Sequence, residues 1–230
     1  MAEAMPGTLV GAGRSADVYE AGDGRVLRRY RDQRPAARVA REAEVMAHAR
    51  AHGAPVPEVF DVAGSDIVME RVDGPTMLTV LSRRPWTLRA QARLLARLHA
   101  AVHAVPPLDW LPAPFSDGDG TQVLLHQDLH PQNVILTADG PRIIDWERAG
   151  RGPAAADVAM TWAVVGFSVA PGGRLTAVKV RTMQGLFCRS FMAAAGPVER
   201  SVLAEAVRLR LADRHLLPPE RARLERVRVT

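Results

Sequence analysis

Side chains with the chemistry of phosphoryl transfer lie close together in the middle of this chain. Asp128 and Asn133 belong to the segment HQDLHPQN (residues 126–133), and Asp145 comes twelve positions after Asn133, directly behind two isoleucines. A carboxylate can orient or accept the proton of an attacking hydroxyl, and an amide oxygen with a second carboxylate can hold Mg²⁺. The spacing therefore predicts Asp128 as the base and Asn133 and Asp145 as the metal ligands.

The two segments resemble the H-x-D-x-H-x-x-N and I-D-W/F motifs of the aminoglycoside phosphotransferase and choline kinase group, small-molecule kinases with a protein kinase-like fold. Gln127 and Gln132 stand where that group most often has glycine. The resemblance implies an α+β fold with two lobes: a small antiparallel β-sheet lobe with one helix (residues 1–72) and a larger, mainly helical lobe (residues 73–230). It also implies ATP and Mg²⁺ as cofactors and a small-molecule hydroxyl as the acceptor.

A glycine-rich segment near the N-terminus has the features of a phosphate-binding hairpin. Gly11, Gly13 and Ser15 lie in TLVGAGRSADVY (residues 8–19), and glycine lets a backbone approach phosphate closely. A Gly-Asp-Gly turn after this segment predicts a hairpin of two strands over residues 16–21 and 25–30. We therefore expect Gly11, Gly13 and Ser15 to line the nucleotide.

Arg28 occupies the position on the second strand of this hairpin where the resembled kinases carry lysine, and Lys179 is the only lysine in the chain. Arginine can hold phosphate oxygens with two prongs, but its fork is bulkier than an ammonium group. Two interpretations follow. Arg28 does the ordinary work of the lysine in an arginine-rich chain, or phosphate binding is weakened and the protein is a slow or catalytically silent nucleotide-binding module.

The resemblance also implies a carboxylate that holds Arg28. A helix is expected over residues 35–53, with Glu42 and Glu44 inside it. The group's pattern places the pairing glutamate directly after an arginine, which selects Glu42. The alternative is that both acids belong to a solvated helix face.

The hinge between the lobes is expected at residues 69–74, after two strands over residues 56–62 and 66–71. The resemblance implies that the carbonyl group of Glu70 and the amide of Val72 contact the adenine.

The helical lobe is expected to begin with an amphipathic helix over residues 88–105 and to continue, after the catalytic segment, with a helix that contains Asp157 and two or three more. The resemblance implies that Asp157 holds the catalytic loop by accepting its backbone N–H groups.

A metal-dependent hydrolase is a competing hypothesis. His126, Asp128 and His130 alternate along an extended segment and could bind zinc together with Asp145. That arrangement leaves Asn133 and the glycine-rich hairpin unexplained.

Composition places further bounds on the protein. With 230 residues, 47% of them hydrophobic, the chain can bury a full core. Cys188 is the only cysteine, which excludes an internal disulfide and fits a cytoplasmic location. The longest apolar run (residues 158–170) is too short to span a bilayer, and no signal peptide is expected. The net charge is +5, yet arginines alternate with acids, so neither a nucleic-acid nor a membrane partner is expected. Oligomeric state and ATP versus GTP preference stay open.

The acceptor is constrained only by charge. Aminoglycosides are polycations, and enzymes that bind them need clustered acids. In the expected acceptor region (about residues 106–122 and 147–230), acids such as Asp117, Asp119, Glu147 and Glu205 are diluted by arginine. An aminoglycoside-like compound, an amino-alcohol, a sugar-like metabolite and an anionic hydroxylated metabolite all remain possible acceptors.

Overall fold

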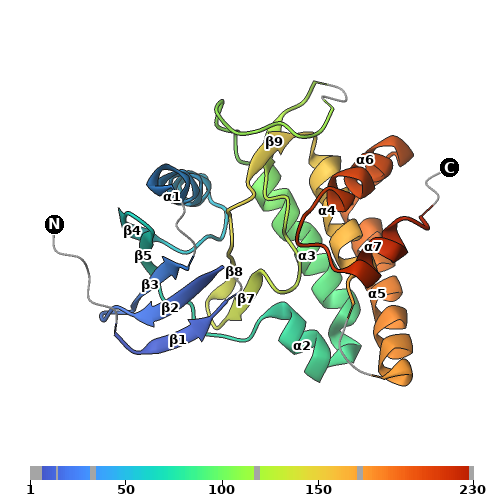
Figure 1. Cartoon of the computed structure of the whole chain (residues 1–230), viewed down its shortest axis with the longest axis horizontal. Coiled ribbons are helices and arrows are strands. Elements are labelled where there is room, and N and C mark those ends of the chain that lie inside the picture. The colour runs from blue at the N-terminus through green and yellow to red at the C-terminus, as the bar shows by residue number, and fades with distance from the viewer. Residues whose placement is uncertain (1–6, 14, 32–34, 117–119, 170–172, 228–230) are drawn as a thin grey trace.

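The computed structural model describes residues 7–13, 15–31, 35–116, 120–169 and 173–227 (Figure 1). A β-sheet with one helix lies at the N-terminal side of the molecule, and a helical part lies at the C-terminal side. This arrangement confirms the α+β class. The acids Asp117 and Asp119 lie outside the described residues.

The sheet has five antiparallel strands in the order β1-β2-β3-β5-β4. They are β1 (Leu9–Ala12), β2 (Ala16–Glu20), β3 (Arg25–Tyr30), β4 (Val59–Ala63) and β5 (Asp66–Glu70). The turn between β2 and β3 has positive φ at Gly22 (73°), Asp23 (47°) and Gly24 (69°), a conformation that glycine adopts at no steric cost. The predicted hairpin is therefore confirmed, and it presents Arg28 in the middle of a central strand.

Helix α1 (Ala36–Ala51) packs against β4 and β5, where the figure places it over one side of the sheet. Its buried face contains Val39, Val45 and Met46 together with one acid, Glu42. After the helix, the strand expected from residue 56 begins only at Val59. Prolines on both sides of Val56 supply no N–H group for a ladder, which explains the late start.

The rest of the described chain is mainly helical. The elements are α2 (Met77–Arg83), the 3₁₀ turn η1 (Pro85–Thr87), α3 (Leu88–His103), β6 (Val123–Leu125), β7 (Val134–Thr137), β8 (Gly140–Ile143), β9 (Gly150–Gly152), α4 (Ala154–Phe167), α5 (Arg174–Ala195), α6 (Arg200–Leu211) and α7 (Pro218–Leu224). Helix α3 packs against α5, and α4 packs against α6. Strands β6 and β9 form one short antiparallel pair, and β7 and β8 form another.

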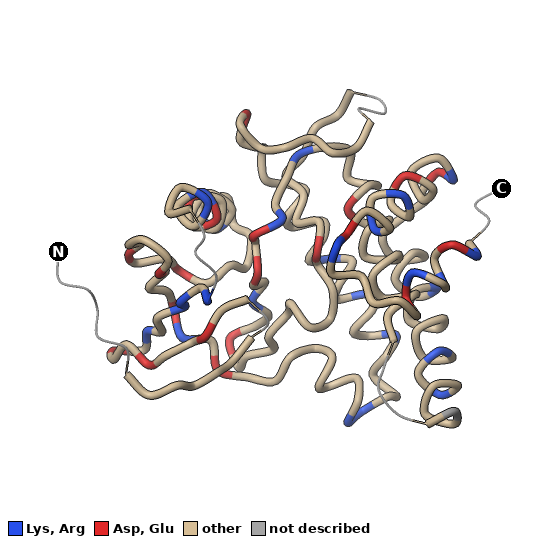
Figure 2. Tube along the Cα trace, viewed as in Figure 1, with Lys and Arg blue, Asp and Glu red and all other residues tan. Residues whose placement is uncertain are grey.

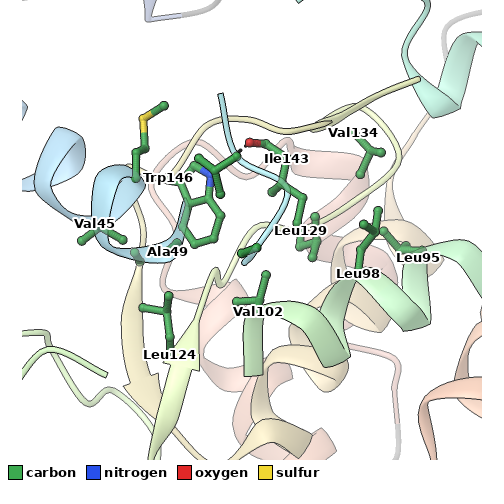
Figure 3. Close-up of a cluster of buried hydrophobic side chains, with 14 of the residues drawn as sticks. Val45, Ala49, Leu95, Leu98, Val102, Leu124, Leu129, Val134, Ile143 and Trp146 are labelled. Carbon is green, nitrogen blue, oxygen red and sulfur yellow. Dashed lines mark hydrogen bonds between the residues drawn. The ribbon is translucent and has the colours of Figure 1, made fainter. Parts of the chain in front are cut away.

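One hydrophobic cluster joins the two parts (Figure 3). Trp146, only 1% exposed, lies between Val45 and Ala49 of α1 on one side and the segment with Leu129 and Ile143 on the other. Burial of each such side chain contributes roughly 1.5–3 kcal/mol. This packing fixes the two loops around Leu129 and Ile143 against both the helix of the sheet part and the helical part.

Along the chain, β5 is the last strand of the five-stranded sheet and ends at Glu70, and the next element, α2, begins at Met77. The lobe boundary at residue 72 therefore stays a prediction that fits this gap. Among the described residues, no helix combines the length and apolarity that crossing a bilayer would require.

Candidate active site

Asp128, Asn133 and Asp145 come from two neighbouring turns that flank the β7–β8 hairpin. The side-chain amide of Asn133 donates from Nδ2 to the carbonyl oxygen of Asp128 (2.9 Å). The N–H of Ile144 donates to the carbonyl oxygen of Asn133 (3.0 Å), which ties the second turn to the first. Since Nδ2 of Asn133 is engaged, Oδ1 is the amide atom suited to a cation. The structure thus brings the three predicted residues together.

A buried carboxylate at the start of α4 holds the first turn. Asp157 accepts from the backbone N–H of His126 at Oδ2 (3.0 Å) and from that of Gln127 at Oδ1 (2.6 Å). The Nε2 atom of His103 lies 3.1 Å from Oδ2. Burial alone would raise the pKa of Asp157, but the hydrogen bond from His103 and the nearby histidines hold it well below its usual range. A charged Asp157 thus clamps the backbone next to Asp128.

Two histidines brace the same turn through hydrogen bonds to its backbone. His126 accepts from the N–H of Asp128 at Nδ1 (3.3 Å), and its Nε2 atom donates to the carbonyl oxygen of Ile144 (3.1 Å). His130 accepts from the N–H of Gln132 at Nδ1 (3.2 Å), so its proton lies on Nε2, 3.6 Å from Oδ1 of Asp128. Burial lowers the pKa of His130, which keeps the ring neutral. The neutral ring of His130 therefore lies next to the carboxylate of Asp128 without a hydrogen bond to it and adds no charge.

These contacts speak against the zinc arrangement considered for His126, Asp128, His130 and Asp145. Both ring nitrogens of His126 are engaged by the backbone and cannot bind a metal. Across the described ranges, no group of three or more His, Cys, Asp or Glu side chains could hold a metal ion.

The guanidinium of Arg28 connects α1 to the second turn. Its Nη1 atom donates to Oε1 of Glu42 (2.6 Å), and its Nη2 atom donates to Oδ1 of Asp145 (2.9 Å). The side chain of Glu42 is 3% exposed, so this acid faces Arg28 and not solvent. Burial alone would lower the pKa of Arg28, but the charges of Glu42 and Asp145 raise it above its usual value. Each prong of the arginine fork thus binds one carboxylate, and further N–H groups of the guanidinium are left for a phosphate.

Tyr30 also belongs to the cluster of Arg28, Glu42 and Asp145. This role was not predicted from the sequence. The hydroxyl of Tyr30 donates to Oε2 of Glu42, and its ring centroid lies 4.8 Å from the guanidinium of Arg28. Burial and the charge of Glu42 raise the pKa of Tyr30, so the phenol stays protonated. Tyr30 lies two positions after Arg28 on β3, and residues two apart share a sheet face. Strand alternation could therefore have identified it.

The sheet register places Gly11 on the same face as Arg28. Gly11 pairs with Val18, and Val18 pairs with Arg28, so the three form one row across β1, β2 and β3. A Cβ added to Gly11 would meet only the Cβ of Val18, at an ordinary 3.8 Å. The fold itself would accept a side chain at Gly11, and glycine keeps the space beside this row open.

Gly13 and Ser15 lie in the connection between β1 and β2. The N–H of Gly13 donates to the carbonyl oxygen of Ala16 (2.8 Å), and the carbonyl oxygen of Ser15 accepts from the N–H of Arg31 (3.0 Å). These bonds hold the hairpin connection in place around residue 14, which lies outside the described residues. Contact of Gly13 and Ser15 with a nucleotide stays a prediction.

Glu70 ends β5, and Val72 follows in the expected hinge. The carboxylate of Glu70 lies 3.6 Å from Nη1 of Arg50 and 3.4 Å from Nε of Arg142. The side chain is therefore committed to ion pairs, and the N–H of Glu70 donates to the carbonyl oxygen of Glu58 (2.8 Å), so the predicted adenine contact concerns the carbonyl group of Glu70. Those contacts of Glu70 and Val72 stay predictions.

The glutamine at position 127 has a structural consequence. Gln127 has a φ of 62°, a region that favours glycine, which explains why glycine is common there in the resembled group. Asp145 has a φ of 69° and is strained in the same way. A Cβ added to Gly150 would lie 2.0 Å from Nε2 of Gln127 and 2.8 Å from the carbonyl oxygen of Pro112. Gly150 therefore makes room for the larger residue at 127.

Comparison with known proteins shows a related sequence segment and similar folds. A stretch of 38 residues is 50% identical to thiamine kinase of Salmonella paratyphi B, and it spans 16% of this chain and 14% of that protein. The chain thus matches only a small part of the length of these curated relatives. The ternary complex of streptomycin, ATP and APH(2″)-IIa superimposes with a TM-score of 0.59 at 12% identity, over 96% of this chain and 91% of that one.

Choline kinase LicA from Streptococcus pneumoniae superimposes with a TM-score of 0.56 at 14% identity, over 90% of this chain and 81% of that one. Both likenesses confirm the protein kinase-like fold. The model of the phosphotransferase enzyme family (APH) matches residues 7–119 and 108–194, which together cover most of the chain. The chain therefore belongs to the phosphotransferase enzyme family.

Proposed function

We propose that this protein transfers the γ-phosphoryl group of ATP to a hydroxyl group of a small molecule. The observation that carries the proposal is the convergence of Arg28, Glu42 and Asp145 beside the turn that bears Asp128 and Asn133. A cation paired with a helix carboxylate, two oxygen ligands for metal and a base on the adjacent loop are the parts that phosphoryl transfer requires. Family membership supports the same reaction.

The residues fit magnesium and a nucleotide. Oδ1 of Asn133 and the second carboxylate oxygen of Asp145 are oxygen ligands of the kind Mg²⁺ prefers, and the side chain of Asp145 is 38% exposed. When bound, ATP would supply the activated phosphoryl group, and magnesium would neutralise part of the charge on the phosphates. Gly11, Gly13 and Ser15 would face its phosphates.

The chain's own groups then have separate roles. Asp128, with His130 beside it, would align the acceptor hydroxyl and accept its proton, and Arg28 would direct guanidinium N–H groups to the phosphates. The backbone groups of Glu70 and Val72 would bind the adenine.

The proposal is tested with purified protein and a panel of amino-alcohols, sugars, nucleosides, hydroxy acids and antibiotics. Magnesium-ATP should raise the melting temperature, and one acceptor should gain the mass of a phosphate group. Replacement of ATP by GTP in the same assay establishes the nucleotide preference. Stabilisation by magnesium-ATP without transfer to any acceptor would instead favour a silent nucleotide-binding module.

A further inference from the structure

Two carboxylates of the expected acceptor region, those of Glu147 and Glu205, already have partners within the described part of the chain. Glu147 accepts from Arg38 (2.7 Å) and is 19% exposed. Glu205 accepts from the hydroxyl of Ser116 (3.1 Å) and from Arg208 (3.2 Å). A cationic acceptor would have to compete with these contacts to pair with Glu147 or Glu205.

The helical part around this region is basic. Helix α5 carries arginine and lysine and has no acidic residue, as Figure 2 shows along its length. Helix α5 therefore offers no carboxylate to a cationic acceptor in place of Glu147 and Glu205.

Two arginines share one buried carboxylate at the end of α6. Arg148 donates from Nη2 and Arg210 from Nη1 to the same oxygen, Oδ2 of Asp213, each at 2.7 Å. The side chain of Asp213 is 5% exposed, whereas that of Arg148 is 40% exposed. Glu220 lies 3.8 Å from Arg210. Of these four charges, the one most accessible to a ligand is the guanidinium of Arg148.

Glu220 itself is engaged elsewhere and is 8% exposed. It accepts from the N–H of Val169 (3.2 Å) and from that of Leu217 (3.4 Å). It therefore offers little to an incoming cation.

Arg148 belongs to the turn that carries Asp145 and is close enough to Asp128 for the two charges to interact. It follows Asp145 by three positions, and its ion pair with Asp213 holds it on the helical side. Burial alone would lower the pKa of Arg148, but the hydrogen bond to Asp213 and the charges of Asp213, Asp128 and Glu147 raise it. Arg210 is also close enough for its charge to help lower the pKa of His130. The guanidinium groups of Arg148 and Arg210, both held by Asp213, therefore lie near the turn that bears Asp128 and His130.

We infer, on the basis of the proposed function, that the acceptor is an anionic alcohol whose carboxylate or phosphate group binds Arg148 while its hydroxyl lies against Asp128. A guanidinium already fixed by one carboxylate loses little side-chain freedom when a second anion binds, and its planar fork suits carboxylate and phosphate alike. The same charges disfavour polycations such as aminoglycosides, because like charges across a binding site oppose association.

The test compares acceptors of equal carbon number that differ in one group: a hydroxy acid, a phosphorylated alcohol, a neutral diol and an amino-alcohol. We expect kcat/KM to be at least about tenfold higher for one of the two anionic classes than for the diol, and lowest for the amino-alcohol. Comparison of the hydroxy acid with the phosphorylated alcohol distinguishes the two sources of anionic charge.

Variants then assign the preference to Arg148. Arg148→Gln should lower the ratio of kcat/KM for anionic over neutral acceptors by about tenfold or more, mainly through KM, and Arg148→Lys should restore part of it. Arg208→Gln is the matched control, since Arg208 is an exposed arginine of α6 paired with Glu205, and it should leave the ratio unchanged.

The outcomes separate this inference from the proposed function. Transfer that favours amino-alcohols or aminoglycosides, or a ratio that Arg148→Gln leaves unchanged, overturns the anionic acceptor and leaves phosphoryl transfer standing. Binding of magnesium-ATP with no transfer to any class overturns the proposed function itself. Melting temperatures of the Arg148 variants show whether a lost ratio reflects unfolding.

Discussion

Arg28 and Asp145, 117 positions apart in the chain, share a hydrogen bond of 2.9 Å between Nη2 and Oδ1. The other prong of the same guanidinium binds Glu42. One arginine therefore holds the helix carboxylate and the proposed metal ligand at once, and it keeps Asp145 in its strained conformation at a φ of 69°. This geometry favours a site built around the fork over a site where arginine merely replaces lysine.

Arg28→Lys should weaken magnesium-ATP binding and lower turnover, each by roughly tenfold, because one ammonium group cannot span both carboxylates in the same planar geometry. Magnesium-ATP affinity is measured by calorimetry and turnover by ADP release. A variant whose turnover holds or rises would show that Arg28 only stands in for lysine.

The matched control for that variant is Arg29→Lys. Arg29 is the next residue on β3, points to the other face of the sheet and pairs with Asp66 through two N–H groups (2.8 and 2.6 Å). Arg29→Lys should change stability slightly and leave nucleotide affinity unaltered.

Tyr30→Phe should lower the free energy of unfolding by about 1–3 kcal/mol, because the buried carboxylate of Glu42 loses a donor and keeps its charge. Urea denaturation measures the change. Tyr19→Phe is the control, since Tyr19 is the chain's other tyrosine and is only partly buried on β2. If both variants lose the same free energy of unfolding, Tyr30 does not stabilise the ion pair of Arg28 and Glu42.

The sequence was sufficient to predict contacts that depend on short spacing or on strand alternation. Asp128 and Asn133 are five positions apart, and the turn that joins them is local. The β2–β3 hairpin follows from its glycine turn. By contrast, the contact of Arg28 with Asp145 and that of Arg148 with Asp213 join residues 117 and 65 positions apart. Only the three-dimensional packing of the two parts brings such residues together.

The late start of β4 had a different cause. The apolar character of Val56 suggested that the strand begins there, and Val56 is indeed fully buried. The prolines on either side removed the backbone donors that a ladder needs, and local chemistry outweighed the apolar pattern.

Gly150→Ala should disturb the catalytic loop, because its new methyl group would lie 2.0 Å from Nε2 of Gln127 and 2.8 Å from the carbonyl oxygen of Pro112. We expect a loss of about 1–3 kcal/mol in the free energy of unfolding, as in other overpacked sites. The double variant with Gln127→Gly should recover part of it, since the side chain in contact is gone. Purely additive effects of the two changes would contradict this coupling.

Acidification below about pH 6.5 should destabilise the protein because a buried histidine resists protonation. Burial lowers the pKa of His99 to about 4, whereas a histidine in an unfolded chain titrates near 6.5. Between these values the unfolded chain takes up a proton that the folded chain does not, so the free energy of unfolding falls as the pH falls from about 6.5 to about 4.

Because of His99, the free energy of unfolding should fall by on the order of 2 kcal/mol between about pH 7 and about pH 5, and His99→Gln should lack this fall. Denaturant titrations at the two pH values measure it, with His52→Gln at an exposed position as the control. The lowered pKa of His130 acts in the same direction, so part of the pH dependence should persist in the variant. An unchanged slope in His99→Gln would mean that this ring titrates normally.

The most direct test of the proposed reaction is Asp128→Asn, assayed with the best acceptor of the panel. Asparagine keeps the shape of the side chain and cannot accept the hydroxyl proton, while Asn133 and Asp145 remain to hold the metal. We expect magnesium-ATP binding within about twofold of the unsubstituted protein and phosphate transfer reduced by at least about a hundredfold. Transfer at an undiminished rate would contradict the assignment of Asp128 and, with it, the proposed mechanism.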